Sequence, residues 1–117
     1  MSYRAKQGDI IRVNLDPQAG NEQKGRRPAL VISNGTFNNF TKKGAMVCPI
    51  TNTDRGLRIQ VKLDERTATT GVIMCDQAKI LDLSQRNAEF IEAVPKEIIL
   101  EAIDIINGFI EFEEHNV

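Results

Sequence analysis

The spacing of apolar residues changes at Pro95, and this change limits the folds that the chain can adopt. Before Pro95, apolar residues alternate with polar ones, as in residues 8–15, or form short runs, as in residues 45–51. Alternation is typical of a half-buried β-strand, and a short apolar run is typical of a strand buried on both faces. From Ile98 to Ile110, apolar residues recur at every third or fourth position, which is helical spacing. The sequence therefore predicts a mainly β structure that ends in one helix.

The predicted strands are short, and Gly, Pro, Asn or Asp residues separate them. We expect mostly antiparallel strands that close into a small barrel, with the helix packed against it. Pro95 suits the first position of that helix, and Glu97 suits the positive end of its dipole. No repeat or linker divides the sequence, so residues 1–117 are expected to form one domain. The predicted strands are residues 8–15, 27–33, 45–51, 57–63, 71–81 and 88–94.

Composition and charge exclude several classes of function. The 117 residues have an ordinary globular balance, 41% hydrophobic and 26% charged, and no apolar run is long enough to cross a bilayer. No segment resembles a signal peptide, so we expect a cytoplasmic protein. The net charge of -1 argues against nucleic-acid binding through bulk charge. Most Lys and Arg residues nevertheless lie in residues 1–62, and residues 89–114 are acidic, which leaves a basic working face open.

Residues that bind metals or act as strong nucleophiles are scarce. The one histidine, His115, lies beyond the helix. Cys48 and Cys75 each lie in an apolar segment, where we expect free, buried thiols. Signature motifs of phosphate-binding loops, zinc proteases and serine hydrolases are absent. An active site would therefore use Arg, Lys, Glu, Asp, Thr and Asn, without a metal or cofactor. RNA phosphodiester transfer suits this set, because the 2′-hydroxyl of the substrate is its own nucleophile.

Three residues stand where such chemistry would need them. Arg27 precedes Pro28 at the entrance to a predicted strand and offers a planar donor fork for phosphate. Thr51 ends an apolar strand and could donate its hydroxyl to phosphate. Asp76 is a carboxylate on an otherwise apolar strand, where burial could favour a role in proton transfer. Each also has a structural interpretation, as a barrel-rim arginine, a strand-end threonine or a turn cap, and the residue types leave both open.

A longer pattern is carried by four segments: GDIIRVNLDPQAGNEQKGRRPALVIS, VCPIT, TTGVIMCDQAKILD and VPKEIILEAIDII. This pattern resembles the MazF/Kid (PemK-type) family of bacterial toxins from type II toxin–antitoxin systems. The resemblance implies an SH3-like barrel with a C-terminal helix, a homodimer, and a cognate antitoxin whose disordered acidic tail blocks the site. It also implies a metal-independent endoribonuclease that cuts single-stranded RNA, leaving a 2′,3′-cyclic phosphate and a 5′-hydroxyl.

The resemblance assigns roles to individual residues. Arg27 would stabilise the transition state and act as proton donor, and Thr51 would contact the phosphate or the 2′-hydroxyl. Glu22 would act as the base or orient Arg27, and Asp76 matches the base of the Kid branch. The expected RNA-binding residues are Asn21, Lys24, Arg26, Asn38, Asn39, Gln77 and Lys79.

Two positions depart from the pattern of the Kid branch. Met74 stands where that branch has a catalytic arginine, and Asn21 stands where it has a histidine. The paired aspartate and arginine of the Kid branch therefore cannot operate unchanged. We expect the arginine and threonine arrangement of the MazF branch instead, with Glu22 or Asp76 as the base.

A polar segment, residues 34–44, is expected to form the opposite wall of the RNA groove. Lys42 and Lys43 would attract phosphates there. Phe37 or Phe40 could stack on a base, although packing at the edge of the core is the more common role of such phenylalanines.

Two other functions remain open at the level of the sequence. One is a toxin of the same fold that binds DNA gyrase without catalysis and relies on an aromatic residue at the end of its helix, where this chain has EFEEHNV. The other is an SH3-like interaction module, which would cleave no RNA. The intact RP arginine and PIT threonine favour the nuclease.

Overall fold

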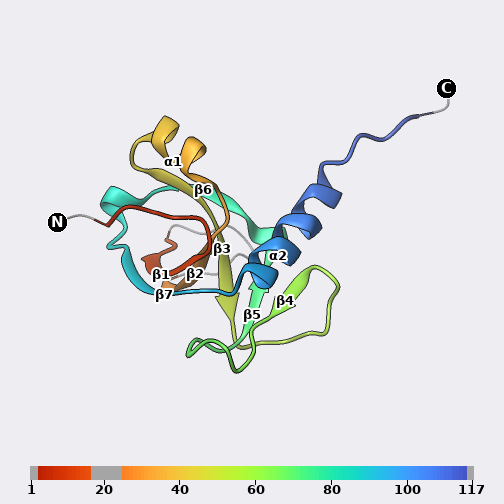
Figure 1. Ribbon diagram of the computed structural model, residues 1–117, viewed down its shortest axis with the longest axis horizontal. Coiled ribbons are helices and arrows are strands. Elements are labelled where there is room, and N and C mark those ends of the chain that lie inside the picture. Colours follow the sequence, from red (N-terminus) through yellow and green to blue (C-terminus); the bar gives the residue numbers. More distant parts are fainter. Residues whose placement is uncertain (1–2, 17–24, 116–117) are drawn as a thin grey trace.

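Antiparallel strands dominate the chain before Pro95 in the computed structural model, which describes residues 3–16 and 25–115 (Figure 1). The two α-helices of these ranges are α1 (Gly35–Thr41) and α2 (Lys96–Phe109). Two 3₁₀ turns, η1 (Cys75–Gln77) and η2 (Leu83–Gln85), lie between strands. The predicted mainly β structure with a C-terminal helix is therefore confirmed. The strands are β1 (Asp9–Asn14), β2 (Arg26–Val31), β3 (Gly44–Thr51), β4 (Gln60–Lys62), β5 (Val72–Met74), β6 (Lys79–Asp82) and β7 (Glu89–Ala93).

The strands lie in the order β4-β5-β3-β2-β1-β7, and β6 also pairs with β3. All of these pairs are antiparallel, as predicted. The expected closed barrel is wrong in one respect, because no ladder joins β6 to β7 within the described residues. The Asp82 carboxylate accepts hydrogen bonds from the Ser84 N–H and hydroxyl (2.9 and 2.6 Å), which turns the chain out of the sheet. Arg86 then reaches the first strand, donating to the carbonyls of Asn14 and Asp16 (3.1 and 2.6 Å).

Both faces of the central strands are buried, which explains the unbroken apolar runs of the sequence. Neighbouring residues of a strand point to opposite faces, so each strand contributes to two clusters. One face carries the sheet cluster, which contains Ile11, Val13, Leu15, Ala29, Val31, Ala45, Val47, Leu81 and Leu83. The other face packs on α2 in the helix cluster, which includes Ile10, Leu30, Cys48, Ile50, Val61, Ile73, Ile98, Ile99 and Ala102.

The strand predicted over residues 57–63 is shorter than expected, because only Gln60–Lys62 is extended. Leu57, expected to be buried by its alternating pattern, is 46% exposed. A turn takes the place of the first half of this strand. The N–H of Gln60 donates to the carbonyl of Leu57 (3.1 Å), and the side-chain oxygen of Gln60 accepts from the N–H of Arg55 (3.2 Å).

Polar residues mark the other changes from the predicted elements. The strand predicted over residues 71–81 is divided by η1, which lies at the two polar residues, Asp76 and Gln77, that interrupt its apolar pattern. The polar segment 34–44 contains α1, whose first turn is capped by Asn34. The side-chain oxygen of Asn34 accepts a hydrogen bond from the N–H of Phe37 (3.0 Å), which satisfies a donor that the helix itself leaves unpaired.

Helix α2 packs its first turns on the sheet and then extends beyond it (Figure 1). Its buried residues, including Ile98 and Ala102, belong to the helix cluster. In the part of the chain that the structure describes, no helix is both long enough and apolar enough for a membrane crossing. Large apolar side chains are exposed on α2 and just after it: Leu100, Phe109, Ile110 and Phe112.

Cys48 and Cys75 are free thiols and both are buried, as predicted. In the ladder between β3 and β5, Ile50 lies opposite Ile73, and the same register extended by two residues sets the cysteines opposite each other. The hydrogen bond that the Cys48 thiol donates to Cys75, together with burial, raises the pKa of Cys48. Both features suppress the reactivity of Cys48, because the thiolate is the nucleophilic form.

We expect a disulfide reagent such as dithiobis(nitrobenzoate) to modify neither thiol while the protein is folded. In strong denaturant, both thiols should react at once. The absorbance of the released thiolate measures both stages. Rapid reaction of one thiol in the native protein would contradict the burial of this pair.

Candidate active site

The register of β2 and β3 brings Arg27 and Thr51 together. Ala29 lies opposite Pro49 in this antiparallel pair, and the same register extended by two residues sets Arg27 opposite Thr51. Alternate residues of a strand share a face, so both side chains lie on the face of the sheet cluster. Paired residues on one face have Cβ atoms about 4.5–5.5 Å apart, and Arg27 and Thr51 lie just beyond the last such pair, Ala29 and Pro49.

Thr51 is held in place by its neighbours on two sides. It is 7% exposed, and its hydroxyl oxygen accepts a hydrogen bond from the N–H of Thr53 (3.3 Å). Gly71 lies against its backbone: a Cβ atom at Gly71 would be 2.4 Å from the Thr51 carbonyl oxygen. Gly71 also has a φ of +117°, which side-chain-bearing residues rarely adopt. Only glycine at position 71 therefore allows the start of β5 to approach the end of β3 this closely.

The loop that leads to Gly71 is fixed by two acidic residues from other elements. The Glu92 carboxylate accepts hydrogen bonds from the N–H of Ala68 (3.0 Å) and from the N–H and hydroxyl of Thr69 (both 2.7 Å). Arg66 donates to Glu97 at the start of α2 (2.8 Å). These contacts tie the loop to β7 and α2. They position Gly71, and through it Thr51, without touching the candidate site.

Acidification should weaken the Glu92 contact. The hydroxyl of Thr69, followed by the N–H groups of Ala68 and Thr69, lowers the pKa of Glu92 below its ordinary value of 4.5. The ionised form therefore stabilises the fold above pH 4.5, and this contribution is lost as the pH falls below 4.5 through the lowered pKa. We expect Glu92→Gln to cost about 1 kcal/mol of unfolding free energy at pH 7 and less at pH 3.

Urea unfolding of wild type and variant at both pH values measures this difference. Glu113→Gln, in the exposed tail, is the matched control and should leave the unfolding free energy unchanged at both pH values. A Glu92→Gln cost that stayed constant between pH 7 and pH 3 would contradict a role for the ionised carboxylate.

Lys79 shares the face that carries Thr51. It lies opposite Val47 in the ladder between β3 and β6, and Val47 belongs to the sheet cluster. Gln77 precedes it by two residues, at the end of η1, and both residues are half-buried. These two expected RNA-binding residues are therefore placed beside the same strand as Thr51.

Asp76 is exposed in η1, between the buried Cys75 and Gln77. It is not the buried carboxylate that its apolar surroundings in the sequence suggested, because the 3₁₀ turn takes it out of the strand. Its solvent-facing position leaves it available to a substrate. The other candidate base, Glu22, lies outside the described residues.

Arg26 is exposed at the start of β2 but is already paired. It forms an ion pair with Glu89 of β7 (2.9 Å) and donates to the carbonyl of Asn87 (3.2 Å). These bonds join β2 to the start of β7, so Arg26 has a structural role beside its expected contact with RNA. The expected RNA-binding residues Asn21 and Lys24 lie outside the described residues.

Asn38 and Asn39 do not lie with the other candidates. Asn38 is 7% exposed, and its side-chain amide donates to the carbonyls of Ala5 and Ser33 (3.3 and 3.2 Å), so its burial does not fit contact with RNA. Asn39 is exposed, but α1 precedes the first residue of β3, whereas Thr51 is the last. Within residues 3–16 and 25–115, no three His, Cys, Asp or Glu side chains gather as a metal site would require.

Sequence reasoning missed Gly71 and Glu92, which position Thr51 from a distance. A glycine at the entrance to a predicted strand was the one available signal for Gly71. No local signal marked Glu92, because its partners lie more than twenty residues away in the sequence.

Comparison with known proteins gives consistent matches over most of the chain. The family described as PemK-like, MazF-like toxin of type II toxin–antitoxin system matches residues 6–109. Endoribonuclease PemK of Escherichia coli is 38% identical over 102 residues, which cover 84% of this chain and 76% of PemK. Endoribonuclease toxin ChpB of Escherichia coli K12 is 35% identical over 111 residues, which cover 91% of this chain and 94% of ChpB.

Solved structures agree with these sequence matches. MazF from Deinococcus radiodurans superposes with a TM-score of 0.87 at 32% identity, covering 95% of this chain and 100% of that one. A chain from the MazE–MazF structure of the same organism superposes with a TM-score of 0.82 at 31% identity, covering 96% of this chain and 100% of that one.

Proposed function

Because this chain belongs to the PemK-like, MazF-like toxin family of type II toxin–antitoxin systems, we propose that Arg27 and Thr51 form the centre of its RNA-cleaving site. The chain is an endoribonuclease, the activity for which its relatives PemK, ChpB and MazF are named. The observation that carries the proposed site is the register that sets Arg27 opposite Thr51 on one face. The half-buried Lys79 and Gln77 beside the same strand support it, since they extend the polar surface available to the RNA backbone.

In the proposed reaction, the 2′-oxygen of the substrate attacks the adjacent phosphorus. The bond from phosphorus to the 5′-oxygen of the next nucleotide then breaks. Arg27 was expected also to act as proton donor, but a guanidinium does not lose its proton in proteins, so that role is left to water. Its guanidinium donates hydrogen bonds to the phosphate oxygens as negative charge develops on them. The Thr51 hydroxyl, which accepts from the Thr53 N–H, donates its own proton to a phosphate oxygen in the proposed complex. The leaving 5′-oxygen takes a proton from water, so the products are a 2′,3′-cyclic phosphate and a 5′-hydroxyl.

A carboxylate takes the proton of the 2′-hydroxyl, and Glu22 and Asp76 are the two candidates. The pH dependence of the single-turnover rate separates them for Glu22→Gln and Asp76→Asn. A general base must be ionised to act, so its protonation produces the acidic limb of this profile. The variant that loses that limb identifies the base.

The proposed function is tested by incubating the purified protein with a long single-stranded RNA in the presence of EDTA. We expect discrete cuts at a short sequence motif, with 2′,3′-cyclic phosphate and 5′-hydroxyl ends. Mapping and chemical analysis of the fragment ends give both results. An absence of cleavage by the folded protein across several unrelated RNAs would contradict the proposal.

Partners follow from the same family membership. We infer a cognate antitoxin, in line with the MazE–MazF structures among the solved neighbours. We also infer a homodimer, because Phe109 and Ile110 at the end of α2 are exposed apolar residues in the single chain. The proposed location is the cytoplasm, where the RNA substrate is. Gyrase binding and a non-toxic interaction module are not favoured, since the matched relatives are named endoribonucleases.

A further inference from the structure

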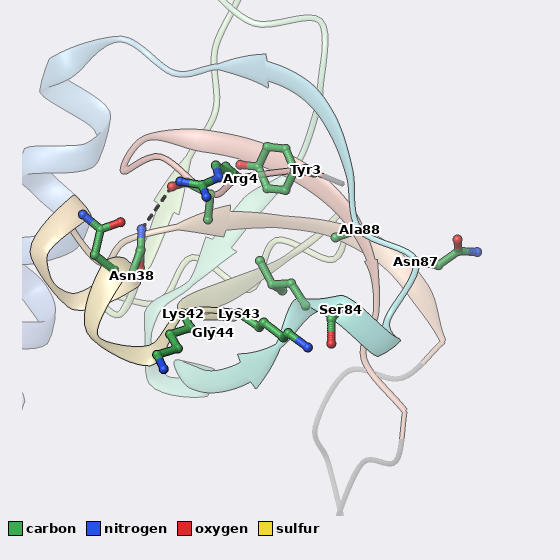
Figure 2. Close-up of a pocket in the computed structure, with 12 residues that line it drawn as sticks. Tyr3, Arg4, Asn38, Lys42, Lys43, Gly44, Ser84, Asn87 and Ala88 are labelled. Atoms are coloured by element: carbon green, nitrogen blue, oxygen red, sulfur yellow. Dashed lines mark hydrogen bonds between the residues drawn. The ribbon is translucent and has the colours of Figure 1, made fainter. Parts of the chain in front are cut away.

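A cavity of about 590 Å³ lies beside the start of β3, at the opposite end of that strand from Thr51 (Figure 2). Its walls come from the N-terminal segment, from the end of α1 with the turn after it, and from the link between η2 and β7. Extended chain from Gly44, in the cavity wall, to Thr51 spans about 23 Å at the usual rise of a strand. The Gly44 side of the cavity is therefore far from Thr51 along β3, whereas its Asn87 side borders Arg26, which donates to the Asn87 carbonyl (3.2 Å).

The charged side chains around this cavity are basic. Arg4, Lys42 and Lys43 line it, and all three are exposed. No acidic residue belongs to its lining in the described part of the chain. Asp82 interacts electrostatically with Lys43, but it lies outside the lining and accepts two hydrogen bonds from Ser84. The cavity therefore presents a net positive charge to solvent.

Backbone strain is concentrated at the same cavity. Among the described residues, Lys42 and Asn87 are the two non-glycine residues with positive φ, and both line it. Lys42 has φ of 66° and ψ of -59°, and the N–H of Lys43 donates to the carbonyl of Thr41 (2.7 Å). This is a γ-turn, a strained conformation in which glycine would be favoured. Strain of this kind persists where the surrounding structure holds it, and it gathers at ligand-binding sites.

The walls of the cavity are preformed. Asn38 ties α1 to the N-terminal segment through its bond to the Ala5 carbonyl, drawn as a dashed line in Figure 2. The Tyr3 hydroxyl donates to Asp9, and the Tyr3 ring stacks on Phe90 with centroids 6.5 Å apart. The exposed side-chain amides that complete the lining belong to Asn39 and Asn87, whereas the Ser84 hydroxyl already donates to Asp82 (2.6 Å).

We propose that this cavity binds the phosphate of a nucleotide. Clustered cations with neutral donors beside them match the charge and the hydrogen-bonding needs of a phosphate group. The volume lies in the range of small-ligand sites, so a whole nucleotide fits. The nucleotide is either part of a single-stranded RNA, at a distance from the bond that is cut, or a free mononucleotide. The first source rests on the proposed function, and the second does not.

The test measures binding of two probes at several salt concentrations. One probe is a fluorescent single-stranded 2′-O-methyl RNA, whose blocked hydroxyls prevent cleavage, and the other is adenosine 5′-monophosphate. Lys42→Gly removes a charge and relieves the strained turn, so it should fold at least as well as wild type. Lys43→Ala removes the neighbouring charge. Lys96→Ala, an exposed lysine of α2 outside the cavity, is the matched control.

If RNA supplies the phosphate, the slope of log affinity against log salt becomes shallower by about 0.7 in each cavity variant and stays unchanged in the control. If a free nucleotide supplies it, adenosine monophosphate binds wild type and control, and binds the cavity variants at least tenfold more weakly. The inference would be overturned if neither probe showed any difference in binding between wild type, the two cavity variants and the control. Cleavage of an unmodified RNA by the wild-type preparation tests the proposed function separately. If the cavity binds no phosphate, wild-type protein should still cleave this RNA.

Discussion

Replacement of Arg27 with alanine is expected to abolish RNA cleavage while the protein remains folded. The β2–β3 register, extended by two residues, sets this guanidinium opposite Thr51. Removing a donor that stabilises developing negative charge lowers the rate of the chemical step on the order of 10²–10³-fold. We expect at least this loss in single-turnover cleavage of a defined RNA, with a smaller change in RNA affinity. Arg27 is half-buried near the start of β2, and the melting temperature of the variant shows whether it remains folded.

Arg26→Ala is the matched control for this experiment. It removes the same charge from the neighbouring residue and breaks the ion pair between Arg26 and Glu89. Both side chains of this pair are exposed. Pairs of this kind contribute at most about 1 kcal/mol, so the variant should fold. Loss of the expected contact of Arg26 with RNA should weaken RNA affinity, but the single-turnover rate at saturating protein should be largely kept, because Arg26 is not assigned to the chemical step. Equal losses of rate in the two variants would show that general charge, rather than the position of Arg27, supports the reaction.

Replacement of Gly71 with alanine is expected to destabilise the protein strongly. The new Cβ atom would be 2.4 Å from the Thr51 carbonyl oxygen, and the φ of +117° would strain any residue with a side chain. Relief requires β3 and β5 to separate at the pair formed by Thr51 and Val72. We expect a loss on the order of 2–3 kcal/mol of unfolding free energy. The folded fraction should also cleave RNA more slowly, because Thr51 moves.

Gly108→Ala provides the comparison for Gly71→Ala. Gly108 lies in α2, and nothing is within 4 Å of a Cβ atom built there. Alanine favours the helix over glycine, so this variant should gain about 0.5–1 kcal/mol. Urea unfolding measures both variants. A Gly71→Ala protein as stable and as active as wild type would contradict the proposed coupling between Gly71 and Thr51.

The sequence predicted those features of the fold that depend on local periodicity. Short strands, the change to helical spacing at Pro95 and the burial of Cys48 all follow from which residues alternate and which do not. The strand predicted over residues 57–63 is wrong in its first half, because side-chain and backbone hydrogen bonds of Gln60 form a turn that periodicity does not reveal. The prediction of a closed barrel is wrong because the chain turns out of the sheet at Asp82.

The residues of the candidate site could be proposed from the sequence, whereas the contacts that position them could not. Arg27 and Thr51 could be proposed from their types and from a family pattern, whereas their proximity depends on a strand register fixed by tertiary structure. Asn38 illustrates the opposite outcome. A polar residue in a polar segment suggested contact with RNA, but its amide satisfies carbonyl groups of the N-terminal segment and of Ser33. Contacts of such long sequence separation leave no mark on the local sequence.

The central claim is that Arg27 and Thr51 act together on one phosphate, and a double-mutant cycle tests it most directly. Single-turnover cleavage of one RNA is measured for wild type, Arg27→Ala, Thr51→Val and the double variant, with Thr51→Ser as the control that keeps a hydroxyl. Groups that act as a unit show strongly non-additive losses. We predict that the double variant is little slower than Arg27→Ala alone and that Thr51→Ser keeps most of the rate. Losses that multiply in the double variant would show that the two residues act independently, which would contradict the proposed site.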